Sequence, residues 1–414
     1  MQVVYHHRTM GRSSQGMHIR SLVEAFRAEG HEVRIVSLPG IDPRQTAGVM
    51  PFLREDDPAH GINRLWKNIS RKCPQFVFEL LELLYNLFIP FRLLPVLKQQ
   101  TSAFLYERHA YFMFMGVLLG KLTRRQVVLE VNELPGFKRA RGLVMKRLAL
   151  KIDRHIFSWA DHILCVSSVL AEEAKRRGAK VDRVHVVPNA IDPKRFQSLG
   201  YGKLVRKRFD LCDSVVVGHV GLFYPWDRLD VLIKIVKDIR ESHPEVKILL
   251  VGDGPEMEKL RQMATEFGMS DTLVFSGPVK REEVAAYIDA MDICVLPDSN
   301  DFGSPIALFE FMAMGKPVVV PDLGPMRDVV AHKLTGLIFP HADYDALKET
   351  LLRLIEDANL RRTVGDAAKR TALKRHTWTE NARFTIRLVS DSNELGNLSS
   401  SHPGIKELKG GRTT

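Results

Sequence analysis

Cysteine is scarce in this chain, with four residues among 414 and none of them in a CxxC pair. Cysteines so few and so far apart argue against a disulfide framework and against a zinc site built from cysteine pairs. We therefore expect a reducing, cytoplasmic compartment. The first residues, MQVVYHHRTMGR, also lack the basic stretch, apolar core and small-residue cleavage site of a signal peptide. We expect no secretory leader there.

A long uninterrupted apolar run is absent as well. The longest apolar stretch, residues 76–97 (FVFELLELLYNLFIPFRLLPVL), is broken by two glutamates, an arginine and two prolines. A membrane-spanning helix needs about 20 predominantly apolar residues, so we expect that this stretch does not span a membrane. Its pattern predicts an amphipathic helix with a turn near Pro90, which is either covered by the core or exposed as an interfacial patch.

Acidic residues are under-represented in the first half of the chain. Residues 1–200 hold 31 Lys and Arg against 18 Asp and Glu, whereas residues 201–414 hold 29 against 31. The positive first half suggests an anionic partner, either nucleic acid or a phospholipid headgroup layer, although solubility alone also explains a basic surface. We rank nucleic acid low because no known nucleic-acid-binding module is present.

The most basic stretch covers residues 138–154 (KRARGLVMKRLALKIDR) and interleaves cations with apolar residues at helical spacing. This pattern predicts a helix with one cationic and one apolar face. The helix is either a solvated face packed on the domain core or a contact with an anionic membrane surface. The cations that would carry the membrane contact are Lys138, Arg139, Arg141, Lys146 and Arg147.

What the sequence does contain, in both halves, is an alternation of short apolar stretches with helical stretches. This alternation predicts an α/β fold of two Rossmann-like domains, whose parallel sheets face each other across a ligand-binding cleft. We expect a basic first domain at residues 1–205, a second domain at 206–378, a helix at 379–391 that packs back on the first domain, and a disordered tail at 392–414.

The most informative segment, residues 297–317, links a buried strand to a short helix through a polar loop. Ser304 is a natural N-cap, Pro305 suits the first helical position and Gly315 follows the last turn. The loop amides and the helix dipole would then point into the cleft and hold a diphosphate. Glu310 lies on an otherwise apolar helix and needs a partner, which is either a ligand or an arginine.

These segments occur in an order that resembles a known family. They are GMHIRSLVEAFRAEGHEVRIVS, CVSSVLAEEAKRRG, VVPNAID, VGDGPE, FSGPV, LPDSNDFGSPIALFEFMAMGKPVVVPDLGPMRDVV and TGLIF. The sequence resembles the GT-B glycosyltransferases, specifically the large retaining family that includes sucrose synthases, mannosyltransferases and many bacterial polysaccharide enzymes. The resemblance covers about residues 1–390 and implies that Glu310 binds the ribose hydroxyls of a sugar nucleotide.

The sequence departs from this family at two places. The family usually has a second Glu eight residues before the first, where this chain has Phe302, preceded by Asp301. It also usually has an Arg and a Lys that neutralise the diphosphate, where this chain has Leu222 and Asp227. We expect Asp301 to substitute imperfectly for the missing Glu, and Arg228 to supply the missing positive charge.

Residues at the ends of predicted strands complete the expected site. Gly16 permits close approach of a ligand to the backbone. His18, His109, Asn132 and Glu133 lie where strands of the first half meet the cleft. The expected catalytic residues are Glu133, Asp301 and Arg228. The expected donor-binding residues are Glu310, Gly303, Ser304, Pro305, Ile306, Gly16, Gly254 and Val279. The expected acceptor-side residues are His18, His109 and Asn132.

The resemblance implies transfer of a sugar from a UDP- or GDP-linked donor to a carbohydrate or lipid-linked acceptor, with retention at the anomeric carbon. We expect no cofactor and no metal, because the nearest acidic string, DSND at residues 298–301, has the wrong spacing for a DxD site. Two alternatives remain at this point. One is a non-catalytic nucleotide-sugar binding or scaffold protein with a degenerate site, and the other is a sugar-nucleotide epimerase of the same fold. The expected location is cytoplasmic, either free or peripheral on the inner face of the membrane.

Overall fold

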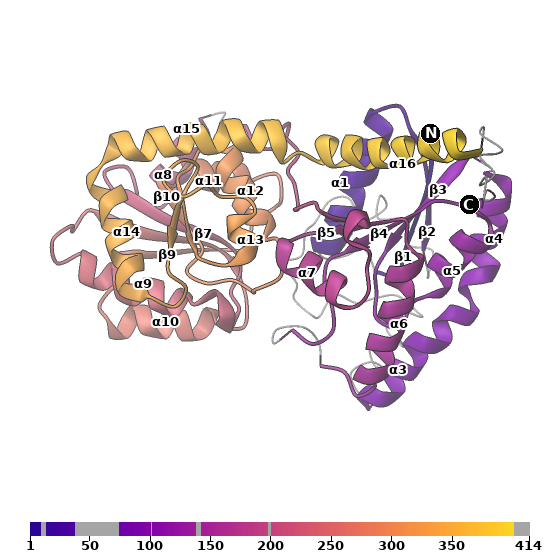
Figure 1. Ribbon diagram of the computed structural model, residues 1–414. Helices are drawn as coiled ribbons and strands as arrows, with labels where there is room; N and C mark the ends of the chain where they lie inside the picture. Colours follow the sequence, from indigo (N-terminus) through magenta and orange to yellow (C-terminus); the bar gives the residue numbers. More distant parts are fainter. Residues whose placement is uncertain (10–13, 38–73, 101, 138–141, 198–199, 401–414) are drawn as a thin grey trace, which may run out of the picture.

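The computed structural model describes residues 1–9, 14–37, 74–100, 102–137, 142–197 and 200–400 (Figure 1). It contains two parallel α/β sheets of six strands each, side by side, which confirms the predicted fold class. The central strands are mostly apolar and buried because helices cover both faces of each sheet. In β4 (Val127–Val131), for example, all five residues are buried.

The first sheet has the strand order β2-β1-β3-β4-β5-β6. Besides β4, its strands are β1 (Gln2–His7), β2 (Glu32–Ser37), β3 (Ala103–Arg108), β5 (His162–Cys165) and β6 (Val184–Val186). The helices around it are α1 (Ser14–Ala28), α3 (Gln75–Leu84), η2 (Tyr85–Leu87), α4 (Ile89–Gln99), α5 (Met115–Leu122), α6 (Lys146–Trp159), α7 (Ser168–Arg176) and η3 (Val181–Arg183).

The second sheet has the order β12-β11-β10-β7-β8-β9. Its strands are β7 (Val215–Leu222), β8 (Val246–Asp253), β9 (Leu273–Gly277), β10 (Ile293–Val295), β11 (Val318–Pro321) and β12 (Leu337–Phe339). The helices around it are α8 (Gly202–Arg208), η4 (Pro225–Asp227), α9 (Leu229–Ile239), α10 (Met257–Glu266), α11 (Val284–Asp289), α12 (Ile306–Ala313), α13 (Gly324–Arg327), α14 (Tyr344–Glu356) and α15 (Ala358–Arg375).

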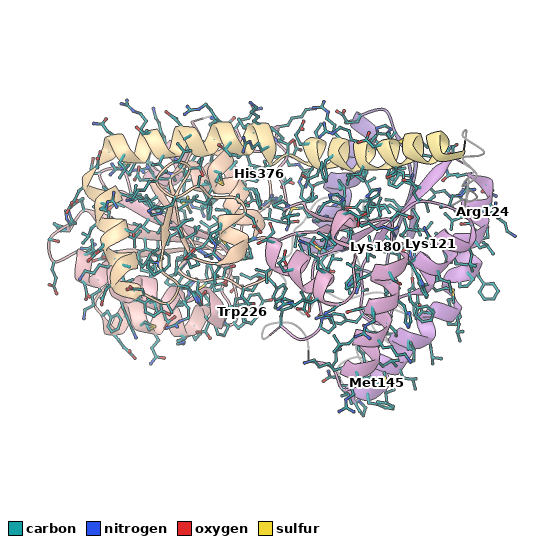
Figure 2. All side chains as sticks on the ribbon, viewed as in Figure 1. Lys121, Arg124, Met145, Lys180, Trp226 and His376 are labelled. Atoms are coloured by element: carbon teal, nitrogen blue, oxygen red, sulfur yellow. The ribbon has the colours of Figure 1, made fainter. Side chains whose placement is uncertain are left out.

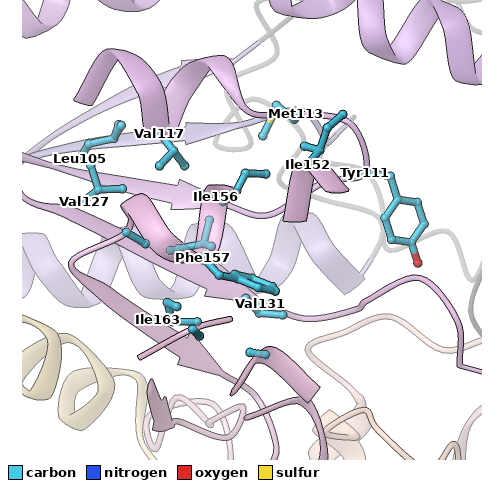
Figure 3. Packing of buried hydrophobic residues seen from close by; sticks show 14 of the residues in the cluster. Leu105, Tyr111, Met113, Val117, Val127, Val131, Ile152, Ile156, Phe157 and Ile163 are labelled. Atoms are coloured by element: carbon cyan, nitrogen blue, oxygen red, sulfur yellow. The ribbon is translucent and has the colours of Figure 1, made fainter. Parts of the chain in front are cut away.

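Each sheet has a core on both of its faces. In β1, Val3 and Tyr5 pack in the cluster formed with α1, whereas Val4 packs in the opposite cluster with α4 to α7. Figure 3 shows part of this second cluster, in which Ile156 and Phe157 of α6 lie over the sheet. The side chains alternate between the two faces because successive residues of a strand point in opposite directions.

The chain enters the second domain before the expected boundary at residue 206. Phe196 and Val205, which precede that boundary, pack in the core of the second domain.

The chain then returns to the first domain through α16 (Trp378–Ser400). This helix lies along α1 (Figure 1), and its Arg383 pairs with Glu29 at 2.7 Å. The tail predicted to begin at residue 392 was placed too early, because α16 continues to Ser400; residues 401–414 lie outside the described residues.

Candidate functional site

The loop after β10 and helix α12 form the centre of the site, but the start of the helix differs from the prediction. Pro305, not Ser304, is the N-cap residue, and Ile306 is the first residue of α12. The backbone N–H of Asn189 donates to Ser304 Oγ at 3.0 Å, and Asn189 Nδ2 donates to the Ser304 carbonyl at 2.6 Å. Ser304 therefore links this loop to the segment between the domains instead of capping the helix. Gly315, with φ 72°, ends the helix as predicted.

Asn300 organises the same loop. Its Oδ1 accepts hydrogen bonds from the backbone N–H of Gly303 and, at 3.3 Å, from that of Phe302. A Cβ at position 303 would lie 2.5 Å from Asn300 Oδ1, so a larger residue there would displace the Asn300 side chain that organises the turn. The Gly303 amide is already bonded, which leaves the diphosphate role expected for it to the neighbouring helix start.

Glu310 is 2% exposed on α12, as its apolar neighbours led us to expect, and its partner is Arg281. The Arg281 guanidinium also lies over the Phe196 ring, 5.0 Å from its centre. The ion pair explains how the fold tolerates a carboxylate at this depth. The sequence analysis did not single out Arg281, although it lies two residues after Val279, an expected donor-binding residue.

The Glu310–Arg281 pair lines a small pocket between the domains. Ile306 of α12 and Met17 and Ser21 of α1 line the same pocket. Gly16 is buried next to Met17 at the start of α1, so the structure brings this expected residue to the same region as Glu310. The pocket is therefore bordered by donor-side and first-domain residues together. Its remaining lining residues are Ala190, Ile191, Asp192, Arg195, Phe196 and Trp378.

Phe302, at the position of the family's second Glu, is a domain contact. It is 6% exposed in the first domain's core cluster, and its ring centre lies 4.9 Å from that of Phe137. The Ser167 hydroxyl donates to the Phe302 carbonyl at 2.6 Å. This contact brings the loop that carries Asp301 next to the loop that carries Glu133. Asp301 is exposed, and the Glu133 carboxylate accepts a hydrogen bond from the Tyr111 hydroxyl.

Arg228 lies at the start of α9 in a left-handed conformation, with φ 52°. Its Nε contacts Asp230 at 3.1 Å, and its terminal nitrogen donates to the Tyr344 hydroxyl at 2.6 Å. The hydrogen bond to Asp230 raises the pKa of Arg228. Asp227 accepts from the Tyr224 amide at 2.9 Å, so it shapes this turn rather than replacing the family's Lys.

A cluster that the sequence analysis missed lies at the end of β10 near Arg228. Asp298 is 8% exposed and accepts from His341 Nε2 at 3.1 Å. The negative charge of Asp298 adds to the rise in the pKa of Arg228 that the hydrogen bond to Asp230 causes. The signal for Asp298 was its place directly after a buried strand, where ligands of parallel sheets bind.

The two remaining donor-side candidates have packing roles. A Cβ on Gly254 would lie 2.4 Å from the Phe223 amide nitrogen, so glycine lets this loop approach the end of β7. Val279 is buried in the same core cluster as Phe196, which is the platform for Arg281.

Two expected acceptor residues are held by a buried carboxylate, Glu130. His18 Nε2 lies 3.1 Å from Glu130 Oε1, and Arg108 and Asn132 also donate to this carboxylate. Burial alone would raise the pKa of Glu130, but the Arg108 and His18 charges outweigh it and hold that pKa well below its ordinary value. His18 and Asn132 are therefore fixed in position at the carboxyl end of β4.

His109 belongs to a separate buried network. Its Nε2 lies 3.0 Å from Asp153 Oδ1, and Arg177 contacts the other Asp153 oxygen at 2.8 Å. The His109 side chain is 1% exposed. The structure thus does not bring His109 to the pocket beside Glu310, because Asp153 holds it against α6.

Comparisons with known proteins agree with this two-domain arrangement. A model described as "Glycosyl transferases group 1" matches residues 206–371, and one described as "Glycosyltransferase Family 4" matches residues 15–195. The GDP-mannose-dependent alpha-mannosyltransferase of Mycobacterium tuberculosis is 27% identical over 60% of this chain and 62% of its own length. The D-inositol 3-phosphate glycosyltransferase of Stackebrandtia nassauensis is 31% identical over 52% of this chain and 50% of its own length.

The match to these two curated relatives spans between half and two thirds of their length. Among solved structures, Anabaena HepE in complex with UDP superposes with a TM-score of 0.66. That comparison covers 97% of this chain and 100% of HepE at 16% identity. At this identity the likeness establishes the fold.

Proposed function

The chain belongs to the group 1 glycosyltransferases of the GT-B fold, and from this premise we propose that it moves a glycosyl unit from a nucleotide sugar to a carbohydrate or lipid-linked acceptor. The observation that carries the proposal is Glu310, a buried carboxylate on α12 at a pocket that both domains line. In the donor complex the Glu310 carboxylate accepts hydrogen bonds from the ribose hydroxyls. The ion pair with Arg281 holds this carboxylate in position.

Electrostatic stabilisation suffices for the chemistry that we propose. The diphosphate leaves with its negative charge directed at the positive end of α12 and at Arg228, in a cleft that excludes water. Asp301 and Glu133, on loops that the Phe302 contact brings together, face the sugar and the acceptor. Retention at the anomeric carbon and independence of metal and cofactor are part of this proposal.

The acceptor and location follow from the first domain. The exposed cations Lys146 and Arg147 begin α6, and they favour an anionic membrane surface that presents a lipid-linked acceptor. Lys138, Arg139 and Arg141 lie outside the described residues. The proposed location is therefore the cytoplasmic face of a membrane, with peripheral attachment. The donor nucleotide is UDP or GDP, and nucleic acid is not a partner.

A thermal-shift panel of nucleotide sugars tests donor binding, because a ligand that binds only the native state raises its melting temperature. We expect Glu310→Gln to weaken binding about tenfold or more, since a charge-assisted hydrogen bond contributes about 1.5–3 kcal/mol. The matched control is Glu349→Gln, the same change at an exposed position of α14. Equal donor affinity in both variants would remove Glu310 from the site.

A turnover assay with the best-binding donor separates the alternatives. Release of nucleotide diphosphate and transfer of the sugar support the proposal. Binding without turnover identifies a non-catalytic nucleotide-sugar binding protein, and a donor recovered with one inverted sugar centre identifies an epimerase.

A further inference from the structure

The segment from α3 to α4 exposes a continuous series of large apolar side chains. Seven of the eighteen large apolar side chains exposed in the described residues fall between positions 76 and 91. The most exposed are Phe91 at 80% and Leu87 and Phe88 at 62% each. We call these seven side chains the apolar ridge: Phe76, Val77, Leu80, Leu84, Leu87, Phe88 and Phe91.

In α3 and η2, which carry five of the seven ridge side chains, the buried side chains are polar and the exposed ones after the first residue are apolar. Glu79 and Glu82 of α3 and Asn86 of η2 are buried, and each has partners. Arg8 pairs with Glu82 at 2.6 Å, and Asn86 Nδ2 donates to the Phe112 carbonyl at 2.7 Å. Because these polar residues of α3 and η2 point inward, every exposed side chain from position 76 to position 91 is apolar, and Arg92 follows at the end of this face. A surface helix in water has the opposite arrangement.

Positive charge borders the apolar ridge. The backbone N–H groups of Val144 and Met145 each donate to the Glu79 carboxylate at 2.7 Å, which places the start of α6 beside α3. Lys146 and Arg147 are exposed there, and Arg92 is exposed on α4. No acidic side chain of α3, α4 or α6 is exposed, because their three carboxylates, Glu79, Glu82 and Asp153, are all buried.

We propose that the apolar ridge inserts into the acyl-chain region of an anionic bilayer while these cations contact the lipid headgroups. The apolar face matches the lipid interior, and the cationic border matches anionic headgroups. The proposal rests on the membrane attachment proposed above and adds which side chains enter the bilayer. It does not depend on which nucleotide sugar is the donor.

The segment lies on the membrane and does not cross it. Residues Gln75–Gln99 are long and apolar enough to span a bilayer by length and composition, with 39% of the most apolar window buried. However, η2 interrupts the helix, and Leu93 and Leu97 of α4 are fully buried in the core of the first domain. Only the outer face is therefore available to lipid. In Figure 1, α3 and α4 form the outer edge of the first domain.

Co-sedimentation of the full chain with vesicles of equimolar phosphatidylglycerol and phosphatidylcholine tests the proposal. The ridge variant is Leu87→Ser/Phe88→Ser/Phe91→Ser. The control variant, Val181→Ser/Leu204→Ser/Leu334→Ser, makes the same number of changes at exposed apolar positions away from the ridge. We expect the ridge variant to lose at least about tenfold in partitioning at low and at molar salt, because salt does not screen apolar burial. The control variant should partition as the parent does.

A separate variant isolates the headgroup contact. Lys146→Gln/Arg147→Gln should weaken binding at low salt, where the electrostatic attraction is unscreened, and should leave the remaining high-salt partitioning unchanged. Equal partitioning of the ridge and control variants would overturn the proposal. Unchanged thermal unfolding and donor affinity in the ridge variant show that a loss of partitioning does not arise from misfolding or from failure of the donor site.

An environment-sensitive fluorophore provides a positive readout of depth. It is attached at Phe91→Cys, or at Leu204→Cys as the control, in a chain with Cys73→Ser and Cys212→Ser; Cys165 and Cys294 are buried. Emission from position 91 should shift to the blue on vesicle binding and be quenched by spin-labelled acyl chains, whereas position 204 should not respond. A parent that is dimeric without vesicles and becomes monomeric in the ridge variant, with no quenching at position 91, would instead make the ridge an interface between copies.

Discussion

In the described residues, the segment that follows the second strand forms different elements in the two domains. In the second domain β8 leads through α10 to β9, an added strand at the sheet edge, and gives an order equivalent to 3-2-1-4-5-6. In the first domain the described part of the corresponding segment is α3, η2 and α4, and β3 follows on the other side of β1. The same architecture thus supplies an edge strand in one domain and an exposed apolar ridge in the other.

The domains also differ in buried charge. The first domain buries Glu130 with Arg108 and His18, Asp153 with Arg177, and Glu107 with His6 at 2.7 Å. In the second domain the buried ion pair beside the candidate site is Glu310 with Arg281. The first domain therefore fixes its strand-end loops largely through buried ions. In the second domain the Asn300 side chain positions the loop before α12 by accepting hydrogen bonds from backbone amides.

Breaking the buried ions of the first domain should have the largest effect. Arg108→Ala leaves Glu130 buried without its main counter-charge, so we expect a loss of about 3–5 kcal/mol in the free energy of unfolding. Arg327→Ala removes an exposed ion pair with Asp322 and should cost less than about 1 kcal/mol. Urea unfolding measures both. The double change Arg108→Met/Glu130→Met should be milder than Arg108→Ala, and a harsher double variant would contradict the explanation.

Acid should destabilise the second domain through two neutral histidines. Burial lowers the pKa of His219 and of His376 to about 4 each. Protons therefore bind the unfolded chain first, and stability that is complete above pH 6.5 is lost as the pH falls toward about 4, by about 1.4 kcal/mol per pH unit for each histidine. Unfolding curves between pH 7 and 5 check this. His219→Gln should flatten the dependence, and an unchanged slope would show that His219 is not responsible.

Turnover should respond modestly to Arg228. If Arg228 replaces the missing family cations, Arg228→Ala should lower turnover about tenfold, which corresponds to about 1.4 kcal/mol of transition-state stabilisation. Arg353→Ala is the matched control, because Arg353 is exposed on α14 and its substitution removes the same charge. Equal rates in the two variants would leave the start of α12 as the diphosphate anchor and remove Arg228 from the catalytic set.

Local patterns in the sequence predicted the features that depend on neighbours along the chain. The alternation of apolar and helical segments predicted two parallel sheets, and Gly315 predicted the end of α12. The apolar surroundings of Glu310 predicted that it needs a partner. The N-cap prediction for Ser304 failed because the Ser304 hydroxyl accepts a hydrogen bond from the Asn189 amide instead. The acceptor-side prediction for His109 did not take Asp153 into account, which holds the His109 side chain against α6. Such partners are far away in sequence, so no local pattern identifies them.

The sequence by itself therefore determined the two α/β domains, the helix that carries Glu310 and the basic character of the first half, because periodicity, turn residues and charge are properties of short segments. Only the tertiary structure decided that Arg281 is the partner of Glu310, that Phe302 joins the domains, and that Glu79 and Glu82 point inward. The physical reason is that burial and ion pairing depend on which surfaces meet. The apolar stretch of residues 76–97 left two possibilities open, and the buried partners of its polar residues are what turn its apolar face outward.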